Sequence, residues 1–148
     1  MGEGDHTPRV LVDDRQTMAV DTDALVALAT ECLLGEGAPD AELSVSFVTE
    51  KEIADLHRRY LGEHGPTDVL SFPLDDAEDR SEDGVRILGD VVMCPAVAAR
   101  NAPADPAREL RLLLVHGILH LLGHDHMAPD ERGWMWERQE RYTGVRIP

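Results

Sequence analysis

The sequence contains few aromatic residues, few cysteines and almost no lysine. Aromatic side chains make up 4% of its 148 residues, and Lys51 is the one lysine among 14 basic residues. Cys32 and Cys94 lie far apart in apolar surroundings and form no C-x-x-C pair, which argues against a disulfide framework. No apolar run approaches the roughly 20 residues that span a bilayer. We therefore expect a cytoplasmic chain with two buried free thiols.

Positive charge is also scarce relative to negative charge. The chain carries 29 acidic and 14 basic residues, a formal net charge of -15 at pH 7. This charge argues against a broad electrostatic surface for nucleic acid, and we expect no DNA partner and no membrane partner. Nearly all the basic residues are nevertheless arginines, and the planar guanidinium suits phosphate groups. A local basic cleft is therefore compatible with the composition.

The length predicts a single domain with its own hydrophobic core. Residues 1–8 are polar and acidic and do not resemble a signal peptide. We expect a flexible N-terminus over residues 1–8 and one folded domain over residues 9–148. The segment from Asp75 to Asp83 holds six acids in nine residues, which predicts a solvated loop.

Alternating and helical periodicities predict about four strands and five helices. The expected strands are Val10–Val12, Leu43–Val48, Thr67–Phe72 and Arg86–Met93. The expected helices are Thr22–Leu34, Glu50–Leu61, Pro95–Asn101, Pro106–Leu122 and a last one from Pro129 to near Tyr142. Strands and helices alternate at first and two helices close the chain. This order favours an α+β or mixed α/β layer fold around the helix that starts at Pro106.

The helix expected over residues 50–61 has a defined start and two faces. Thr49, with Glu52 three residues later, resembles a capping box. The spacing places three side chains inward, Ile53, Leu56 and Tyr60. It exposes three others near the helix end, His57, Arg58 and Arg59. These either contact a phosphate ligand or form a solvated last turn, where cations face the negative end of the helix dipole.

Four of the seven histidines fall within the eleven residues from His116 to His126. Residues four apart on a helix share one face, about 6 Å apart along the axis, which brings His116 and His120 side by side. Gly123 then lets the chain leave the helix in a left-handed conformation, so that His126 folds back as a third ligand. Three neutral imidazoles with an open fourth position are typical of a catalytic zinc site. We therefore expect one Zn²⁺ per chain on these three histidines.

Two residues near the turn leave alternatives open. His124 competes with His126 as the third ligand, but it follows His120 by only four residues, before the turn is complete, so we prefer His126. Asp125 either accepts a hydrogen bond from a ligand imidazole or caps the turn. Chance clustering of histidines is the competing interpretation of the whole segment.

The spacing matches a zinc protease motif except at one position. Metzincin proteases use H-E-x-x-H-x-x-G-x-x-H, whereas this chain has H-G-x-x-H-x-x-G-x-x-H. Gly117 stands where a protease carries its glutamate general base. The predicted ligands are retained without the base, which argues against ordinary proteolysis.

Asp90 lies in the middle of an otherwise apolar predicted strand. A carboxylate buried there without a partner is costly. Asp90 therefore either faces solvent or supports a fixed group such as a metal ligand.

Two blocks resemble the YbeY endoribonuclease family, also described as rRNA maturation factors. The first is H-G-x-L-H-L-x-G-x-D-H, from His116 to His126. The second is P-T-D-V-L-S-F-P, from Pro66 to Pro73, followed by L-G-D, from Leu88 to Asp90. The resemblance implies a small α+β domain with a mixed four-stranded sheet and a zinc ion on His116, His120 and His126. It also implies action on RNA at the 3′ end of small-subunit rRNA, in ribosome maturation and quality control.

The chain departs from the family pattern at two positions. The family commonly has tyrosine before the Asp-His pair, where this chain has His124. It often has an arginine important for RNA cleavage directly after the helix tyrosine, but here Tyr60 is followed by Leu61. Arg59 lies on the other side of Tyr60, rotated by about 100° per residue around the helix. We expect Arg59 to take the arginine role only if it reaches the same cleft.

These observations lead to a zinc-dependent single-strand endoribonuclease as the expected function. A zinc ion would lower the pKa of water toward ~7 or polarise a phosphoryl oxygen. We assign catalysis to His116 and Arg59, substrate contacts to Arg58 and Ser71, and support of the ligands to Asp90 and Asp125. The expected partners are rRNA and the small ribosomal subunit, together with a ribosomal protein or an assembly GTPase. A non-enzymatic zinc-containing assembly factor and a metallopeptidase-like hydrolase are the alternatives.

Overall fold

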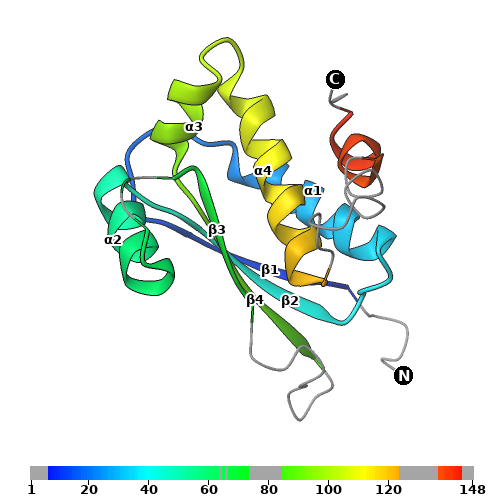
Figure 1. Ribbon diagram of the computed structural model, residues 1–148. Helices are drawn as coiled ribbons and strands as arrows, with labels where there is room; N and C mark the ends of the chain where they lie inside the picture. The colour runs from blue at the N-terminus through cyan, green and yellow to red at the C-terminus, as the bar shows by residue number, and fades with distance from the viewer. Residues whose placement is uncertain (1–6, 64, 66, 74–84, 124–136, 145–148) are drawn as a thin grey trace.

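The chain folds around a four-stranded mixed sheet with helices packed on one face (Figure 1). The structure is a computed structural model, which describes residues 7–63, 65, 67–73, 85–123 and 137–144. The strands are β1 (Arg9–Asp14), β2 (Ala41–Phe47), β3 (Val69–Pro73) and β4 (Arg86–Met93). The labelled helices are α1 (Thr22–Gly35), α2 (Glu50–Leu61), α3 (Pro95–Asn101) and α4 (Pro106–Leu121). A fifth described helix covers residues 137–143, and the predicted α+β fold is confirmed.

The strand order is β1-β2-β4-β3, with one antiparallel pair at the edge. β1 runs parallel to β2, and β2 runs parallel to β4. β3 pairs antiparallel with β4, with Ser71 opposite Val91 and Phe72 opposite Asp90. Because successive side chains of a strand point to opposite faces, Ser71 and Phe72 belong to different sides of the sheet.

Local capping explains where three of the helices begin. The Asp21 carboxylate accepts from the Ala24 amide at 3.1 Å, so Asp21 caps α1. The Thr49 hydroxyl accepts from the Glu52 amide at 3.2 Å, as the capping box predicts. The carboxylate of Glu52 binds the Nε of Arg15 at 3.1 Å, which ties α2 to the chain that follows β1. α4 starts with an Asp105 cap and a proline in its first turn.

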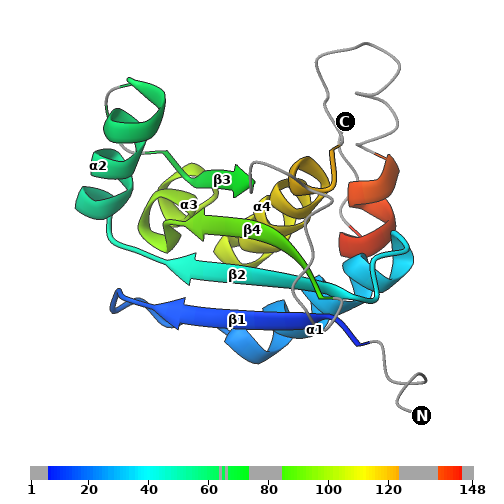
Figure 2. The same cartoon turned by 90° about the horizontal axis from the view of Figure 1, so that it is seen from below.

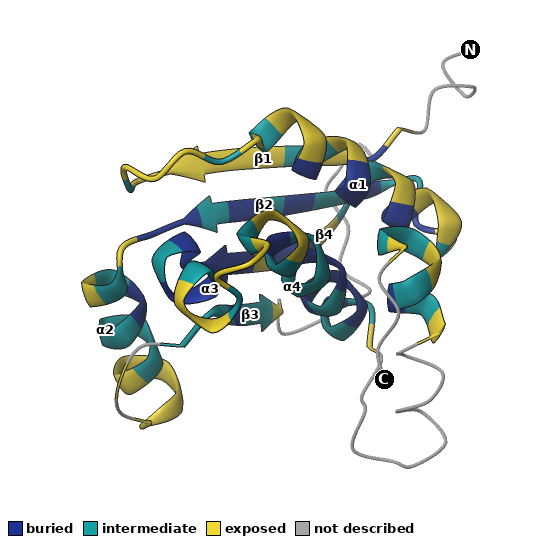
Figure 3. Ribbon diagram, turned by 90° about the horizontal axis from the view of Figure 1, so that it is seen from above, coloured by how far each residue is buried: buried dark blue, intermediate teal, exposed yellow. Residues whose placement is uncertain are grey.

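The hydrophobic core lies between the sheet and the helices α1, α3 and α4, which cover one face (Figure 3). α4 buries much of its length, and the alternation along β2 places every second residue in this core. In Figure 2 the strands lie in front of these helices, and α2 stands at one end of the sheet. The position of α4 against the sheet agrees with the central place predicted for the histidine helix.

Two side chains of α2 differ from the expected inward and outward faces. Tyr60 is 61% exposed rather than buried, because the last turn of α2 extends beyond the strands, and its ring meets Phe72 edge-on at a centroid distance of 5.4 Å. The side chain of His57 is only 12% exposed, since its ring lies against the chain after the helix. Its Nδ1 lies 3.0 Å from the Gly65 carbonyl and its Nε2 lies 3.0 Å from the Glu63 carboxylate. Only Ile53 of α2 is fully buried.

A bulge in β4 depends on a glycine. Glu42 of β2 pairs with Ile87 and Leu43 pairs with Gly89, so Leu88 is the extra residue. Gly89 has φ +136°, and a Cβ at this position would overlap the carbonyl oxygen of Phe72 on β3. The glycine of the L-G-D block is therefore a backbone requirement of the β2-β4-β3 junction.

Both cysteines are buried and free, as predicted. Burial raises the pKa of the Cys32 thiol to about 12, with a further contribution from the negative charges of Glu36 and Glu31. A thiol with this pKa stays protonated near neutral pH and packs as a small hydrophobic residue.

In the part of the chain that the structure describes, no helix is both long and apolar enough to cross a membrane.

Candidate functional site

Two histidine rings of α4 face each other at the surface of the helix layer. The Nε2 atoms of His116 and His120 lie 3.0 Å apart. The ring centroids lie 4.5 Å apart at an interplanar angle of 69°. Both residues are half-buried. The prediction that the helix repeat brings His116 and His120 side by side is confirmed. Each ring directs its Nε2 atom toward the other.

The geometry of the pair fits a shared metal ion. Two nitrogens that each lie about 2.1 Å from a tetrahedral zinc ion are about 3.4 Å apart. The observed separation of 3.0 Å is close to this value, so a small opening of the pair would admit an ion. Within the described residues no group of three potential ligands is found. The predicted third ligand His126, its competitor His124 and the supporting Asp125 all lie outside the described residues.

The chain turns directly after the histidine helix as expected. α4 ends at Leu121, and Gly123 adopts φ +99°, a left-handed conformation that glycine tolerates without strain. The amide of Gly123 donates to the His120 carbonyl at 3.0 Å, which closes the helix end beside the second histidine.

A cavity of about 320 Å³ lies beside the two histidines. Its walls come from the end of α2, from β3 and from the last turns of α4. The lining residues are Leu61, Val69, Leu70, Ser71, Pro73, His116, His120 and Leu121. The structure therefore brings Ser71, a predicted substrate contact, to the same cavity as the predicted ligands.

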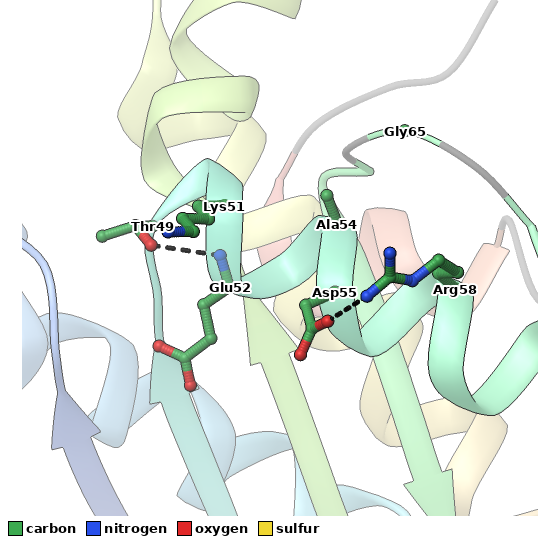
Figure 4. Close-up of a pocket in the computed structure, with 7 residues that line it drawn as sticks. All are labelled: Thr49, Lys51, Glu52, Ala54, Asp55, Arg58 and Gly65. Atoms are coloured by element: carbon green, nitrogen blue, oxygen red, sulfur yellow. Dashed lines mark hydrogen bonds and ion pairs between the residues drawn. The ribbon is translucent and has the colours of Figure 1, made fainter.

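The two arginines of α2 lie elsewhere. Arg58 Nη2 binds Asp55 Oδ1 at 2.6 Å, and Arg59 Nε lies 3.7 Å from Asp55 Oδ2. Arg58 and Asp55 line a separate hollow of about 660 Å³ along α2, with Thr49, Lys51, Glu52, Ala54 and Gly65 (Figure 4). The Arg59 side chain is 63% exposed and does not line the histidine cavity. The roles assigned to these arginines stay predictions, and the described contacts do not support them.

Leu61 occupies the wall position that the predicted arginine was expected to reach. It lines the cavity beside His116 and His120, although the residue is 56% exposed. Because each residue rotates the helix by about 100°, Arg59 points about 200° away from Leu61. Leu61 therefore brings an apolar side chain to this wall of the cavity, and neither Arg58 nor Arg59 lines it.

Asp90 lies on the face of the sheet opposite the histidines. It is exposed and lines a groove of about 570 Å³ with residues of β1, β2 and α2. Its neighbour Val91 faces α4 instead. Of the two interpretations of Asp90, the structure shows solvent exposure, and no described contact connects it with either histidine.

Gly117 is required by the packing of α4 on the sheet. A Cβ on Gly117 would lie 3.0 Å from Val91 Cγ1 and 3.1 Å from Ser71 Oγ. These separations are tighter than ordinary packing contacts, so a side chain here would force α4 away from β3 and β4. A side chain at the position of the protease glutamate would thus be directed at the sheet.

This packing predicts the outcome of restoring the protease residue. We expect Gly117→Glu to lower the free energy of unfolding by about 3 kcal/mol or more, because it both overpacks the interface and buries a carboxylate. We expect no peptidase activity from it. Urea denaturation and a zinc-supplemented peptide-cleavage assay check both statements, with Gly117→Ala as the milder control. Wild-type stability together with gained peptidase activity would contradict the packing argument.

Gln139 contacts the site and was not predicted from the sequence. Its Oε1 lies 2.7 Å from His116 Nδ1, on the side of the ring away from His120. Gln139 is 5% exposed and is the one fully buried polar residue in the part of the chain that the structure describes. A glutamine in an amphipathic helix carries no signal that distinguishes a buried partner of histidine from a solvated residue.

The helix that carries Gln139 is anchored on the end of α1 through one carboxylate. Arg138 Nη1 lies 2.8 Å from Glu36 Oε2, and the Tyr142 hydroxyl donates to the same oxygen at 2.6 Å. The Glu36 side chain is 4% exposed. In Figure 1 this C-terminal helix, drawn in red, lies beside α1.

This anchor predicts a loss of stability at alkaline pH. Burial, together with the hydrogen bond to Glu36, raises the pKa of Tyr142 to about 12 from an ordinary value of 10.0. Between pH 10 and 12 the unfolded chain releases this proton more readily than the folded chain, so stability falls as pH rises. We expect Tyr142→Phe to be less stable than wild type at pH 9 and to lose this difference by about pH 12. Chemical denaturation across this range measures it, and a constant difference would contradict it.

Comparisons with known proteins agree with the two sequence blocks. The sequence model described as Endoribonuclease YbeY matches residues 11–144. The chain is 56% identical to Endoribonuclease YbeY of Frankia alni over 112 residues, covering 70% of this chain and 62% of that protein. It is 47% identical to that of Mycobacterium tuberculosis over 111 residues, covering 70% and 63%. The match thus spans less than two thirds of each of these two relatives.

A solved structure supports the same relationship. The solution structure of a Thermotoga maritima protein is similar with a TM-score of 0.61 at 29% identity. The similarity covers 92% of this chain and 86% of that one. The family match includes both sequence blocks, residues 66–73 and residues 116–126. The fold and the two motifs therefore indicate the same family. The chain belongs to the endoribonuclease YbeY family.

Proposed function

We propose that this protein is a zinc-dependent endoribonuclease that cleaves single-stranded RNA. One observation carries the proposal: two histidine Nε2 atoms converge at 3.0 Å beside a cavity that Ser71 also lines. The relatives named Endoribonuclease YbeY provide the reaction class. His116, His120 and His126 would hold the ion, one per chain, with His126 as the predicted third ligand.

The composition of the cavity supports a role for a cation. Its described walls consist of apolar residues, one serine and the two histidines, and none of these side chains carries a permanent charge. A phosphodiester is anionic, and these walls alone offer it no compensating charge. Bound at the histidines, zinc would supply Lewis acidity toward a phosphoryl oxygen or water.

The residues of the chain have distinct tasks in this proposal. His116 and His120 would present their Nε2 lone pairs to the ion. The Ser71 hydroxyl lies in the same cavity and is able to donate a hydrogen bond to a phosphate oxygen. Leu61, Val69 and Leu121 give this cavity apolar walls.

We further propose that the substrate is rRNA near the 3′ end of the small-subunit precursor. The net charge of -15 disfavours tight binding of free RNA. The small subunit, with a ribosomal protein or an assembly GTPase, would therefore present the RNA to the cavity. This cleavage would be a step of ribosome maturation and quality control in the cytoplasm.

The test is a cleavage assay on three substrates. Zinc-loaded protein is incubated with a single-stranded RNA that ends in the precursor 3′ sequence, with the same RNA in a duplex, and with the assembled subunit. We expect internal cleavage of the single strand and faster cleavage in the subunit. No cleavage of any substrate, with zinc content confirmed, would overturn the proposal and favour a non-enzymatic assembly factor.

A metallopeptidase is the weaker candidate for the same site. A protease of this motif needs a carboxylate after the first histidine. Here that position faces Val91 and Ser71 across a packed interface. Cleavage of peptides without cleavage of RNA would favour the peptidase.

A further inference from the structure

The C-terminal helix reaches the histidine pair through one buried side chain. Gln139 Oε1 lies 2.7 Å from His116 Nδ1, and the residue is 5% exposed. Covering a polar amide from solvent is costly unless it is hydrogen-bonded. The contact with His116 supplies that partner, so Gln139 and His116 are matched to each other across 23 residues of sequence.

The chemistry of this contact selects one form of the His116 ring. A glutamine Oε1 only accepts hydrogen bonds, so the proton of the neutral imidazole resides on Nδ1. The lone pair then lies on Nε2, the atom that faces His120 at 3.0 Å. Histidine ligands of zinc commonly donate their other ring N–H to a fixed acceptor, which sets both the tautomer and the ring orientation.

The helix that presents Gln139 is itself fixed at two adjacent points. Arg138 and Tyr142 flank Gln139 and both bind Glu36 at the end of α1. The Tyr142 ring lies so close to Gly35 that a Cβ there would overlap its hydroxyl group. The helix therefore has little freedom to slide along α1, and the amide of Gln139 stays in place.

We propose that Gln139 is a positioning residue for the metal site. It holds the proton of His116 on Nδ1, so that the Nε2 lone pair, which faces His120, is the one that would bind the ion, while Glu36 holds the helix through Arg138 and Tyr142. The inference rests on the proposed zinc site at His116 and His120. It assigns to the C-terminal helix a function in metal affinity in addition to its packing on α1.

Three variants separate positioning from mere packing. Gln139→Leu keeps the size of the side chain but removes the acceptor. Gln139→Glu keeps an acceptor at the same distance, because a carboxylate oxygen also receives the Nδ1 proton. Glu137→Gln is the matched control on the same helix, since the Glu137 side chain is 71% exposed and pairs only with Arg141 among the described ion pairs.

The measurement is zinc affinity by competition with a chromophoric chelator, together with ¹⁵N NMR of the His116 ring in the metal-free protein. We expect Gln139→Leu to weaken zinc binding about 10- to 100-fold and to shift the ring toward the Nε2–H tautomer. We expect Gln139→Glu to stay within about threefold of wild type, and Glu137→Gln to match it.

The outcomes test the positioning role of Gln139 and the proposed zinc site separately. Wild-type zinc affinity and tautomer in Gln139→Leu would overturn the positioning role. A tenfold loss in Gln139→Glu would also overturn it, even if Gln139→Leu fails to fold, because an acceptor is still present. If wild type binds no zinc, or if His120→Ala binds it equally well, the proposed site itself fails.

Discussion

Replacement of His120 by alanine is expected to reduce RNA cleavage about 10³-fold or more while the protein remains folded. The imidazole Nε2 lies 3.0 Å from that of His116, and its loss removes one of the two predicted zinc ligands that the structure describes. Metal ions contribute several kcal/mol to stabilising charge in the transition state, and ~4 kcal/mol corresponds to about 10³-fold in rate. The measurement compares initial rates of cleavage of one single-stranded RNA at equal protein concentration and records zinc content.

The chain offers a matched control for this experiment. His57 is a half-buried histidine whose ring nitrogens lie near the Gly65 carbonyl and the Glu63 carboxylate, outside the histidine cavity. We expect His57→Ala to retain one zinc per chain and to cleave RNA at nearly the wild-type rate. Equal rates for His120→Ala and wild type would place the chemistry elsewhere in the molecule.

Replacement of Gly89 by alanine is expected to destabilise the fold by at least about 3 kcal/mol. A non-glycine residue held at an unfavourable φ costs about 1–3 kcal/mol. At φ +136° the added Cβ would also overlap the Phe72 carbonyl oxygen, which is backbone and moves only if β3 moves. The free energy of unfolding from urea titration measures the effect. Because β3 forms a wall of the histidine cavity, we also expect weaker cleavage from the folded fraction.

Gly62→Ala is the control for the conformational part of this effect. Gly62 caps α2 with φ +69°, and a Cβ there meets nothing within 4 Å. Its expected cost is about 1 kcal/mol, from the left-handed conformation alone. If Gly89→Ala lost no more stability than Gly62→Ala, the proposed overlap with β3 would be wrong.

Local patterns in the sequence predicted the elements closely. The cap at Thr49, and the strand with alternating apolar residues, depend on neighbours within a few residues of the chain. The placement of His116 beside His120 is equally local, because it follows from the helix repeat. These features were therefore predictable from the sequence without knowledge of the fold.

Contacts between segments that are distant in the sequence could not be predicted in this way. The burial of Gln139 depends on α4 and on the end of α1, which lie far from it in sequence. The exposure of Tyr60 depends on where the strands end beneath α2, which the helix pattern does not contain. The face of the sheet on which Asp90 lies depends on the register of β4, which includes a bulge that the sequence pattern does not reveal.

Helix geometry also explains why the arginine assignment has no support in the structure. Arg58 and Arg59 are sequence neighbours of the cavity residue Leu61, but both share Asp55 as an ion-pair partner along α2. Whether a residue of a helix reaches a site depends on which side of the helix faces that site. This orientation is known only once the packing of the helix is known. The predicted substrate contact Ser71 was easier to place, since one strand face determines it.

The central claim is that a metal ion on the α4 histidines is required for RNA cleavage. The most direct test removes zinc with a chelator and restores it in measured steps while cleavage of a single-stranded RNA is followed. We predict that cleavage disappears on removal and returns in proportion to zinc, reaching its maximum at one ion per chain, and that His116→Ala shows no return. Full cleavage by the zinc-free protein, or equal recovery in His116→Ala, would contradict the claim.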